Sequence, residues 1–308
     1  MRLMWLSALS TAALSATALQ AQPALADDEI VVTAQRAGAP VWRVRTSTGI
    51  LVLVGSIDSV AAGTAWRPEA LARTVAQADR VMFPQMIGIS LSPFSLVNYY
   101  AKWKRRARLP EGQSLSGMMS KADFARLANL AGRGLAPADF NRWHPLHLSF
   151  NMQDRLRKQT GLMEEPTATV SRAASKSRVK KLPIQRASTR PIADTLFRSR
   201  PMEHLPCLTA TIAAVESGPE GLRQRSRDWA GKKVQAALAA PSQGVGKACW
   251  PTSMNALDPV QLAGTARRSL GTPGTTLAVV NLDALARSGG LLDTLRSEGH
   301  QVEGPTWR

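Results

Sequence analysis

Histidine and cysteine, which serve most often in acid–base, nucleophilic and transition-metal chemistry, are few in this chain. The sequence has four histidines and two cysteines. His144 and His147 have a His-x-x-His spacing, but the proline between them interrupts a regular helical face, so we interpret them as loop or surface residues. Ser177 and Lys180 form a Ser-x-x-Lys pattern inside a basic stretch, where chance matches are common. The sequence has no phosphate-binding Gly-x-x-x-x-Gly-Lys loop and no dinucleotide fingerprint.

The clearest secondary-structure pattern lies before residue 84. Two apolar runs on either side of a polar turn predict a hairpin, and the second run lacks polar alternation, which is typical of a strand buried on both faces. A proline then opens a predicted helix, and another short strand follows. The predicted elements are the strands Val41–Val44 and Ile50–Ile57, a helix from Pro68, and the strand Arg80–Phe83.

A second strand–turn–helix pattern closes the chain. Thr275–Asp283 is a largely apolar run that predicts a buried strand. Gly289-Gly290 then precedes a predicted helix over Leu291–Glu298, and a final strand begins at Val302. Because this strand and the second strand of the hairpin are both continuously apolar, we expect them to lie close together in one sheet.

The middle of the chain is predicted to be mainly helical. Ser120 with Asp123 is a capping-box signature, and Pro145 breaks the helical pattern of Asp139–Leu156. Thr167–Arg190 is rich in Lys, Arg, Ser and Ala, so we interpret it as an exposed, basic and poorly packed segment. Further helices are predicted from Leu96 into the basic run Lys102–Arg108, over Pro206–Glu216, and over Leu222–Leu238.

The two ends of this pattern resemble the TraB/GumN family, relatives of the Tiki metalloproteases and of the wider EreA/ChaN-like group. The resemblance covers about Pro40–Val302 and implies an α/β (α+β) fold with mixed sheets flanked by helices. It rests on Pro40, Trp42, Gly55-Ser56-Ile57, Gly63 and Trp66 near one end, and on Leu285, Gly290-Leu291-Leu292, Leu295, Arg296 and Gly299 near the other.

The same resemblance implies a site that this sequence has lost. In the family, two His residues and a Glu are thought to meet in one cleft and serve metal-dependent hydrolysis. The corresponding positions here are Asp58, Pro84 and Ala284. Proline and alanine have no side-chain ligand, and one carboxylate cannot make a tight transition-metal site. We therefore expect no bound metal or other cofactor and no catalytic residue.

Residues 1–26 have the pattern of a signal peptide, with Arg2, an apolar stretch and Ala24-Leu25-Ala26 before a predicted cleavage. This predicts export to the periplasm. Cys207 and Cys249 are the only cysteines, and an exported protein with one pair is expected to bridge them. The predicted organisation is an extended lead-in over 27–39 and a single domain over 40–305 that contains the basic segment.

The formal net charge of +17 favours polyanionic partners such as anionic lipid headgroups or lipopolysaccharide. Aromatic residues make up only 5% of the chain, which argues against a single-strand nucleic-acid binder. We expect a catalytically degenerate family member that acts by binding. One alternative is a hydrolase with a rebuilt site that uses Asp58, His144 or His147. Another is a basic structural protein of the cell envelope, and the partner, which could also be another periplasmic protein, is not identified by the sequence.

Overall fold

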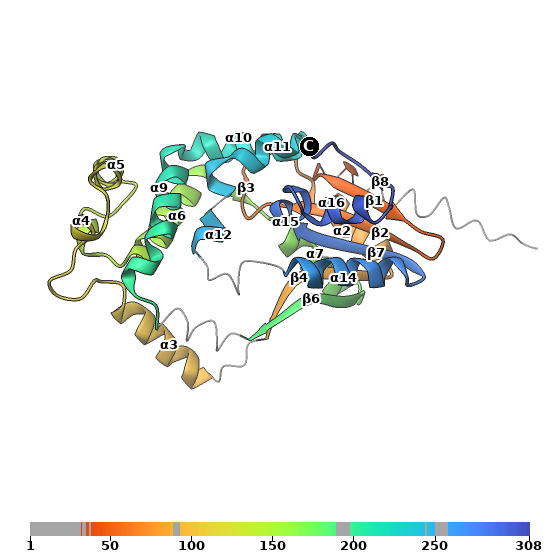
Figure 1. Cartoon of the computed structure of the whole chain (residues 1–308), viewed down its shortest axis with the longest axis horizontal. Coiled ribbons are helices and arrows are strands. Elements are labelled where there is room, and N and C mark those ends of the chain that lie inside the picture. The colour runs from red at the N-terminus through yellow and green to blue at the C-terminus, as the bar shows by residue number, and fades with distance from the viewer. Residues whose placement is uncertain are drawn as a thin grey trace, which may run out of the picture.

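The computed structural model describes residues 32, 35, 36, 38–88, 93–188, 198–243, 245–249 and 258–308. Within these residues, one six-stranded mixed sheet has the order β6-β4-β7-β2-β1-β8, and β3 pairs with β5 separately (Figure 1). The strands are β1 (Val41–Arg45), β2 (Gly49–Ser56), β3 (Val60–Ala61), β4 (Arg80–Gly88), β5 (Leu162–Met163), β6 (Lys180–Ser188), β7 (Gly274–Asn281) and β8 (Val302–Glu303).

Helices surround this sheet and also form a separate group at one end of the molecule, where α3, α4, α5, α6 and α9 lie (Figure 1). The helices before residue 180 are α2 (Pro68–Gln77), α3 (Pro93–Arg105), α4 (Leu115–Met118), α5 (Lys121–Gly132), η1 (Phe140–Arg142), α6 (Pro145–Thr160) and α7 (Pro166–Lys176). Those after it are η2 (Pro201–His204), α9 (Leu205–Glu216), α10 (Gly218–Ala230), α11 (Val234–Ala239), η3 (Pro241–Gln243), α12 (Val245–Cys249), α14 (Pro259–Leu270), α15 (Leu282–Ala286) and α16 (Leu291–Ser297). None of the helices described is both long and apolar enough to cross a bilayer.

The central pairing of the sheet joins the two ends of the chain, as the sequence predicts. β2 runs parallel to β7 over eight residue pairs, from Gly49 opposite Gly274 to Ser56 opposite Asn281. β1 pairs antiparallel with β2, which confirms the hairpin. The mixed α/β fold expected from the sequence is therefore confirmed.

Helices cover both faces of the sheet, which explains why β2 lacks polar alternation. All eight residues of β2 are buried. One group of helices consists of α2 and α7, which pack on each other, and α7 contacts β2, β4 and β7. The other consists of α14, which contacts β2 and β6, and of α16, which packs on α14. The crossovers β2–α2–β4 and β6–α14–β7 run in opposite directions across the sheet, so right-handed connections place these helices on opposite faces.

The helices away from the sheet have a hydrophobic core of their own. Leu127, Leu148 and Ile212, from α5, α6 and α9, belong to this second buried cluster. α10 joins the two cores, because its Leu222 lies in the helical cluster and its Trp229 lies in the sheet cluster. The extent of one domain over 40–305 stays a prediction.

Several sequence-based boundaries differ from the structure. The part of the basic segment that the structure describes, 167–188, is not poorly packed: α7 buries Val170 and Ala174 on the sheet, and β6 pairs with β4 along its length. β4 continues through Pro84 to Gly88, because β6 supplies a parallel partner that the sequence pattern did not reveal. The predicted helix over 222–238 is two helices, α10 and α11, separated where Lys232 has a positive φ.

The predicted signal peptide, residues 1–26, lies outside the described residues, as does most of the lead-in over 27–39. The three lead-in residues described before Gly38, which are Val32, Gln35 and Arg36, are helical rather than extended.

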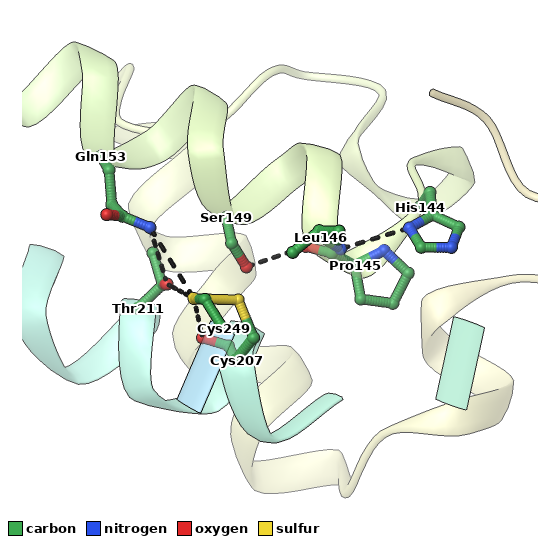
Figure 2. The surroundings of a disulfide bond; sticks show 8 residues. All are labelled: His144, Pro145, Leu146, Ser149, Gln153, Cys207, Thr211 and Cys249. Carbon is green, nitrogen blue, oxygen red and sulfur yellow. Dashed lines mark hydrogen bonds between the residues drawn. A yellow bond between two sulfur atoms is a disulfide. The ribbon is translucent and has the colours of Figure 1, made fainter. Parts of the chain in front are cut away.

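The predicted disulfide is present between Cys207 in α9 and Cys249 at the end of α12 (Figure 2). Both cysteines are buried, and their Cα atoms lie 4.2 Å apart. Thr211 of α9 and Gln153 of α6 place polar atoms near the Cys249 sulfur, at 4.0 Å each. The bridge thus ties α12 to the helical core.

We expect the double variant Cys207→Ser/Cys249→Ser to unfold at lower urea concentration than the wild-type protein. The bridge spans 42 residues of sequence, and removing a loop constraint of this size costs roughly 4 kcal/mol on the chain-entropy model. Equilibrium urea denaturation measures the difference. The wild-type protein, denatured without reductant, should show no thiols in a colorimetric titration, and two reactive thiols there would contradict the assignment.

Candidate functional site

Two polar side chains meet where the central parallel strands end. Asp58 follows β2 by two residues, and Asn281 is the last residue of β7. Parallel strands end at the same edge of a sheet, where α/β proteins commonly bind ligands. The Asn281 amide donates a hydrogen bond to the Asp58 carboxylate, with Nδ2 and Oδ1 3.3 Å apart. The predicted meeting of the two strand–turn units is confirmed.

Asn281 also organises the polypeptide around this edge. Its side-chain oxygen accepts from the backbone N–H of Asp283 at 2.9 Å, which caps α15. The same oxygen lies 3.3 Å from Nε2 of Gln243, a donor on η3. A single amide therefore connects the end of β7, the start of α15 and the η3 segment, and holds Asp58 beside them.

The most deeply buried charge near Asp58 is the guanidinium of Arg225, on α10. Arg225 is only 2% exposed. Its Nη2 donates to the carbonyl of Ser59 at 3.0 Å, and its Nη1 lies 3.4 Å from the Gln243 side-chain oxygen. Burial lowers the pKa of Arg225 to about 10, against the attraction of Asp58, so the group remains a cation at neutral pH.

A cavity of about 190 Å³ opens beside these groups. Asp58 and Arg225 line it together with Arg157, which projects from α6. Glu165 does not line the cavity, but it interacts electrostatically with Asp58 and Arg157. Burial, with the charge of Asp58 second, raises the pKa of Glu165. The cavity is thus bordered by one carboxylate and two guanidiniums.

The other two family-motif positions do not join Asp58 in this cavity. Ala284 lies in α15, three residues after Asn281, and lines a separate hollow of about 10 Å³ with Arg287 and Gly290. Pro84 lies in β4, two residues beyond Met82, which pairs with Ala278 of β7. The Pro84 side chain lies outside the described part of the chain.

The scaffold residues of the resemblance pack tightly around the end of β2. Trp42 is buried and donates from its indole to the Pro305 carbonyl, and a Cβ added at Gly55 would lie 3.1 Å from the Trp42 ring and 2.8 Å from Leu282. Trp66 donates to the Glu164 carbonyl and makes an edge contact with Trp229, whose own indole donates to the Gly55 carbonyl at 2.8 Å.

The remaining scaffold residues lie at the end of β2 and on either side of α16. Ser56 is the buried last residue of β2. Gly290 precedes α16, and an added Cβ there would lie 2.6 Å from the Leu285 carbonyl oxygen. Gly299 follows α16 with a φ of +86°. These positions shape the fold around the cavity rather than line it.

The histidines weighed as replacement ligands lie at the other end of α6. His144 caps the helix, since its ring Nδ1 accepts from the Leu146 backbone N–H, and His147 stacks on Trp103 with ring centroids 3.7 Å apart. His144 and His204 have ring centroids 5.3 Å apart. All three histidines are buried, so the prediction that His144 and His147 are loop or surface residues is wrong. His147 lies ten residues before Arg157, or about 15 Å along the helix, so the cluster is distant from Asp58.

The donors at the Asp58 cavity do not fit the metal centre that the family resemblance implies. Divalent transition metals need several neutral imidazoles, thiolates or carboxylates as ligands. The cavity lining supplies one carboxylate, from Asp58, and two cations, from Arg157 and Arg225. Across the ranges that the structure describes, no three His, Cys, Asp or Glu side chains come together as a group able to hold a metal ion.

Sequence reasoning missed Arg225 and Arg157. The signal for Arg225 was present, because Leu222, Arg225 and Trp229 follow the i, i+3, i+7 spacing of one helix face. An arginine between two apolar positions on one face indicates a buried guanidinium. Arg157 has no such signal, since the charged residues that share its cavity, Asp58 and Arg225, come from distant parts of the chain.

The comparison with known families agrees with this fold. A family model described as TraB/PrgY/gumN matches residues 40–304, which is most of the chain. No curated protein and no solved structure matches it. The chain belongs to the TraB/PrgY/gumN family.

We expect acidification to destabilise the protein through its buried histidines. Burial, with the charge of His204 second, holds the pKa of His144 at about 3 and that of His147 at about 4. These values lie below the unfolded value of 6.5, so the unfolded chain binds more protons below pH 6.5, and stability is lost as pH falls from there toward 4. Between pH 7 and pH 5 the loss should be on the order of 1 kcal/mol per histidine, after allowance for partial solvent exposure.

Urea denaturation at several pH values measures this slope. His147→Gln should flatten the slope, whereas His300→Gln, which lies outside the cluster, should leave it unchanged. Equal slopes in the two variants would contradict the role of the cluster.

Proposed function

We propose that this protein is an exported member of its family that binds a ligand at the Asp58 cavity and has no metal-dependent hydrolase activity. The observation that carries the proposal is the donor set described above, one carboxylate beside two guanidiniums. A divalent cation at Asp58 would have one anionic ligand and would be repelled by the buried Arg225.

The retained scaffold supports binding rather than loss of all function. The Trp66–Trp229 contact and the indole bond from Trp229 to the Gly55 carbonyl fix the end of β2 and the segment before α2 against α10. Such a shaped, partly apolar cavity with a few convergent polar groups is the usual form of a small-molecule site.

Export is supported by two features of the chain. Residues 1–26 have the composition of a signal peptide. The Cys207–Cys249 bridge is the kind of crosslink that persists in oxidising compartments such as the periplasm.

Peptide hydrolysis by the purified protein, with added zinc, manganese or cobalt, tests the absence of metal chemistry. We expect no turnover above the buffer blank with any of the three ions, because the cavity cannot ligate them. The control is Asp58→Ala, which removes the one carboxylate. Turnover that requires a metal and disappears in this variant would reveal a rebuilt active site and refute the proposal.

A second candidate function is attachment to an anionic envelope surface, and α3 favours it. This helix lies outside the sheet, at the edge of the helical group (Figure 1). Val97 and Tyr100 are 70% and 59% exposed on it, and Lys104 lies over the Tyr100 ring at 4.9 Å. Exposed apolar side chains beside basic ones suit the surface of an anionic bilayer.

We expect the protein to sediment with phosphatidylglycerol-containing vesicles and not with pure phosphatidylcholine. Each basic residue near an anionic surface contributes ~1 kcal/mol, so Lys104→Gln/Arg105→Gln should weaken binding roughly thirtyfold. The matched control is Lys176→Gln/Lys180→Gln, which removes the same charge from the sheet end of the molecule. If both pairs weaken binding equally, net charge and not α3 is responsible.

A further inference from the structure

The cavity beside Asp58 has apolar walls as well as charged ones. It lies between α6, α9, α10, the η3–α12 segment and the loop after β2. Cavities of about 150 Å³ hold benzene, so a volume of about 190 Å³ has room for a compact organic molecule. Its apolar lining consists of Phe150, Leu156, Ala214, Leu222 and Val245.

Arg225 faces this cavity with an incomplete set of hydrogen bonds. Its two described acceptors, the Ser59 carbonyl and the Gln243 side chain, are both neutral. Its Nε is buried and has no hydrogen-bond partner in the part of the chain described. Buried arginines are almost always paired with an anion, because an uncompensated buried charge is costly.

Two further donors converge on the same cavity. The Ser242 hydroxyl is buried and also has no hydrogen-bond partner among the described residues. Arg157 lies at the exposed side of the cavity lining. The three donors come from α10, η3 and α6, so tertiary packing alone brings them together.

The carboxylate of Asp58 attracts Arg225 and offsets only one of these two cations. It accepts from Asn281 at the end of β7. The lining therefore carries two positive charges and one negative charge. A bound group with one negative charge would neutralise the cavity lining.

We propose that the cavity binds a small carboxylate, with its anionic group at Arg225, Ser242 and Arg157 and its apolar part against the Phe150 and Leu222 wall. The apolar lining favours an organic acid over inorganic phosphate. This inference rests on the proposed binding function and specifies the ligand class.

Thermal unfolding and calorimetry of the full chain with benzoate and hexanoate as probes test the inference. A ligand that binds only the folded state raises the melting temperature. We expect at least one of the two acids to raise the Tm by several degrees at constant ionic strength. Benzamide, benzylamine and sodium phosphate, matched in size or charge, should have no comparable effect.

Variants test the assigned donors. Arg157→Gln and Ser242→Ala should each weaken binding of the carboxylate about tenfold, the value for loss of one charge-assisted hydrogen bond. The control is Arg155→Gln, in the same helix, because the Arg155 guanidinium bonds to Asn151 and the Gly134 carbonyl outside the cavity. The Arg155→Gln variant should bind the carboxylate as tightly as the wild-type protein does. Arg157 and Ser242 are used because a substitution at the buried Arg225 risks unfolding the chain.

The outcomes separate this inference from the proposed function. If neither acid binds, or if both variants bind as tightly as the wild-type protein, the carboxylate assignment is wrong. If benzamide or benzylamine binds instead, the cavity is a ligand site for another chemical class. Metal-dependent peptide hydrolysis would overturn the proposed function whatever the carboxylates do.

Discussion

The parallel pairing of β2 with β7 is the interaction on which the rest of this structure depends. Its eight residue pairs join strands that are more than two hundred residues apart in the sequence. Because parallel strands need long crossover connections, all of the chain between β2 and β7, including α2, the helical middle and α14, lies within the connection that this pairing closes. It also places Asp58 and Asn281 at the same edge, which makes the site possible.

The docking of α10 on the loop after β2 is the second constraint. Trp229 donates to the Gly55 carbonyl, Ser226 accepts from the Ala61 backbone N–H, and Arg225 donates to the Ser59 carbonyl. Three side chains within about one and a half helical turns thus satisfy backbone groups at the end of β2, in the turn after it and in β3, which would otherwise lose hydrogen bonds on burial. The cavity lies where the helical core meets the sheet core, so its shape depends on both.

The proposed binding site uses the family scaffold for a chemistry different from the one that the resemblance implies. The tight approach of Gly55 to Trp42 and Leu282 is a constraint on the fold and is independent of what Asp58 does. A cavity held by such a scaffold can exchange its charged lining without loss of shape. Arg157 and Arg225 then determine the electrostatics of the site, because guanidiniums retain their charge even when buried.

The accuracy of the sequence-based predictions follows the range of the interactions that decide each element. The predictions of the hairpin and of the Ser120 cap on α5 were correct, because a turn and a cap are determined by neighbouring residues. The prediction that the basic segment is poorly packed was wrong. Its many lysines led to the prediction of an exposed segment outside the sheet. The structure shows instead that β6 is an edge strand of the sheet, where lysines are common because they discourage pairing with other chains. The extension of β4 past Pro84 was also not predicted, because its partner β6 lies about one hundred residues away in the sequence.

The sequence by itself therefore determined the strand and helix pattern at both ends of the chain and the cysteine pair. These are local or compositional properties, and they can be derived without knowledge of the fold. Only the tertiary structure decided that Arg157, Arg225 and Ser242 line one cavity with Asp58, whereas Ala284 lines another. Convergence of residues from separate helices depends on how those helices pack, and no spacing along the chain encodes it.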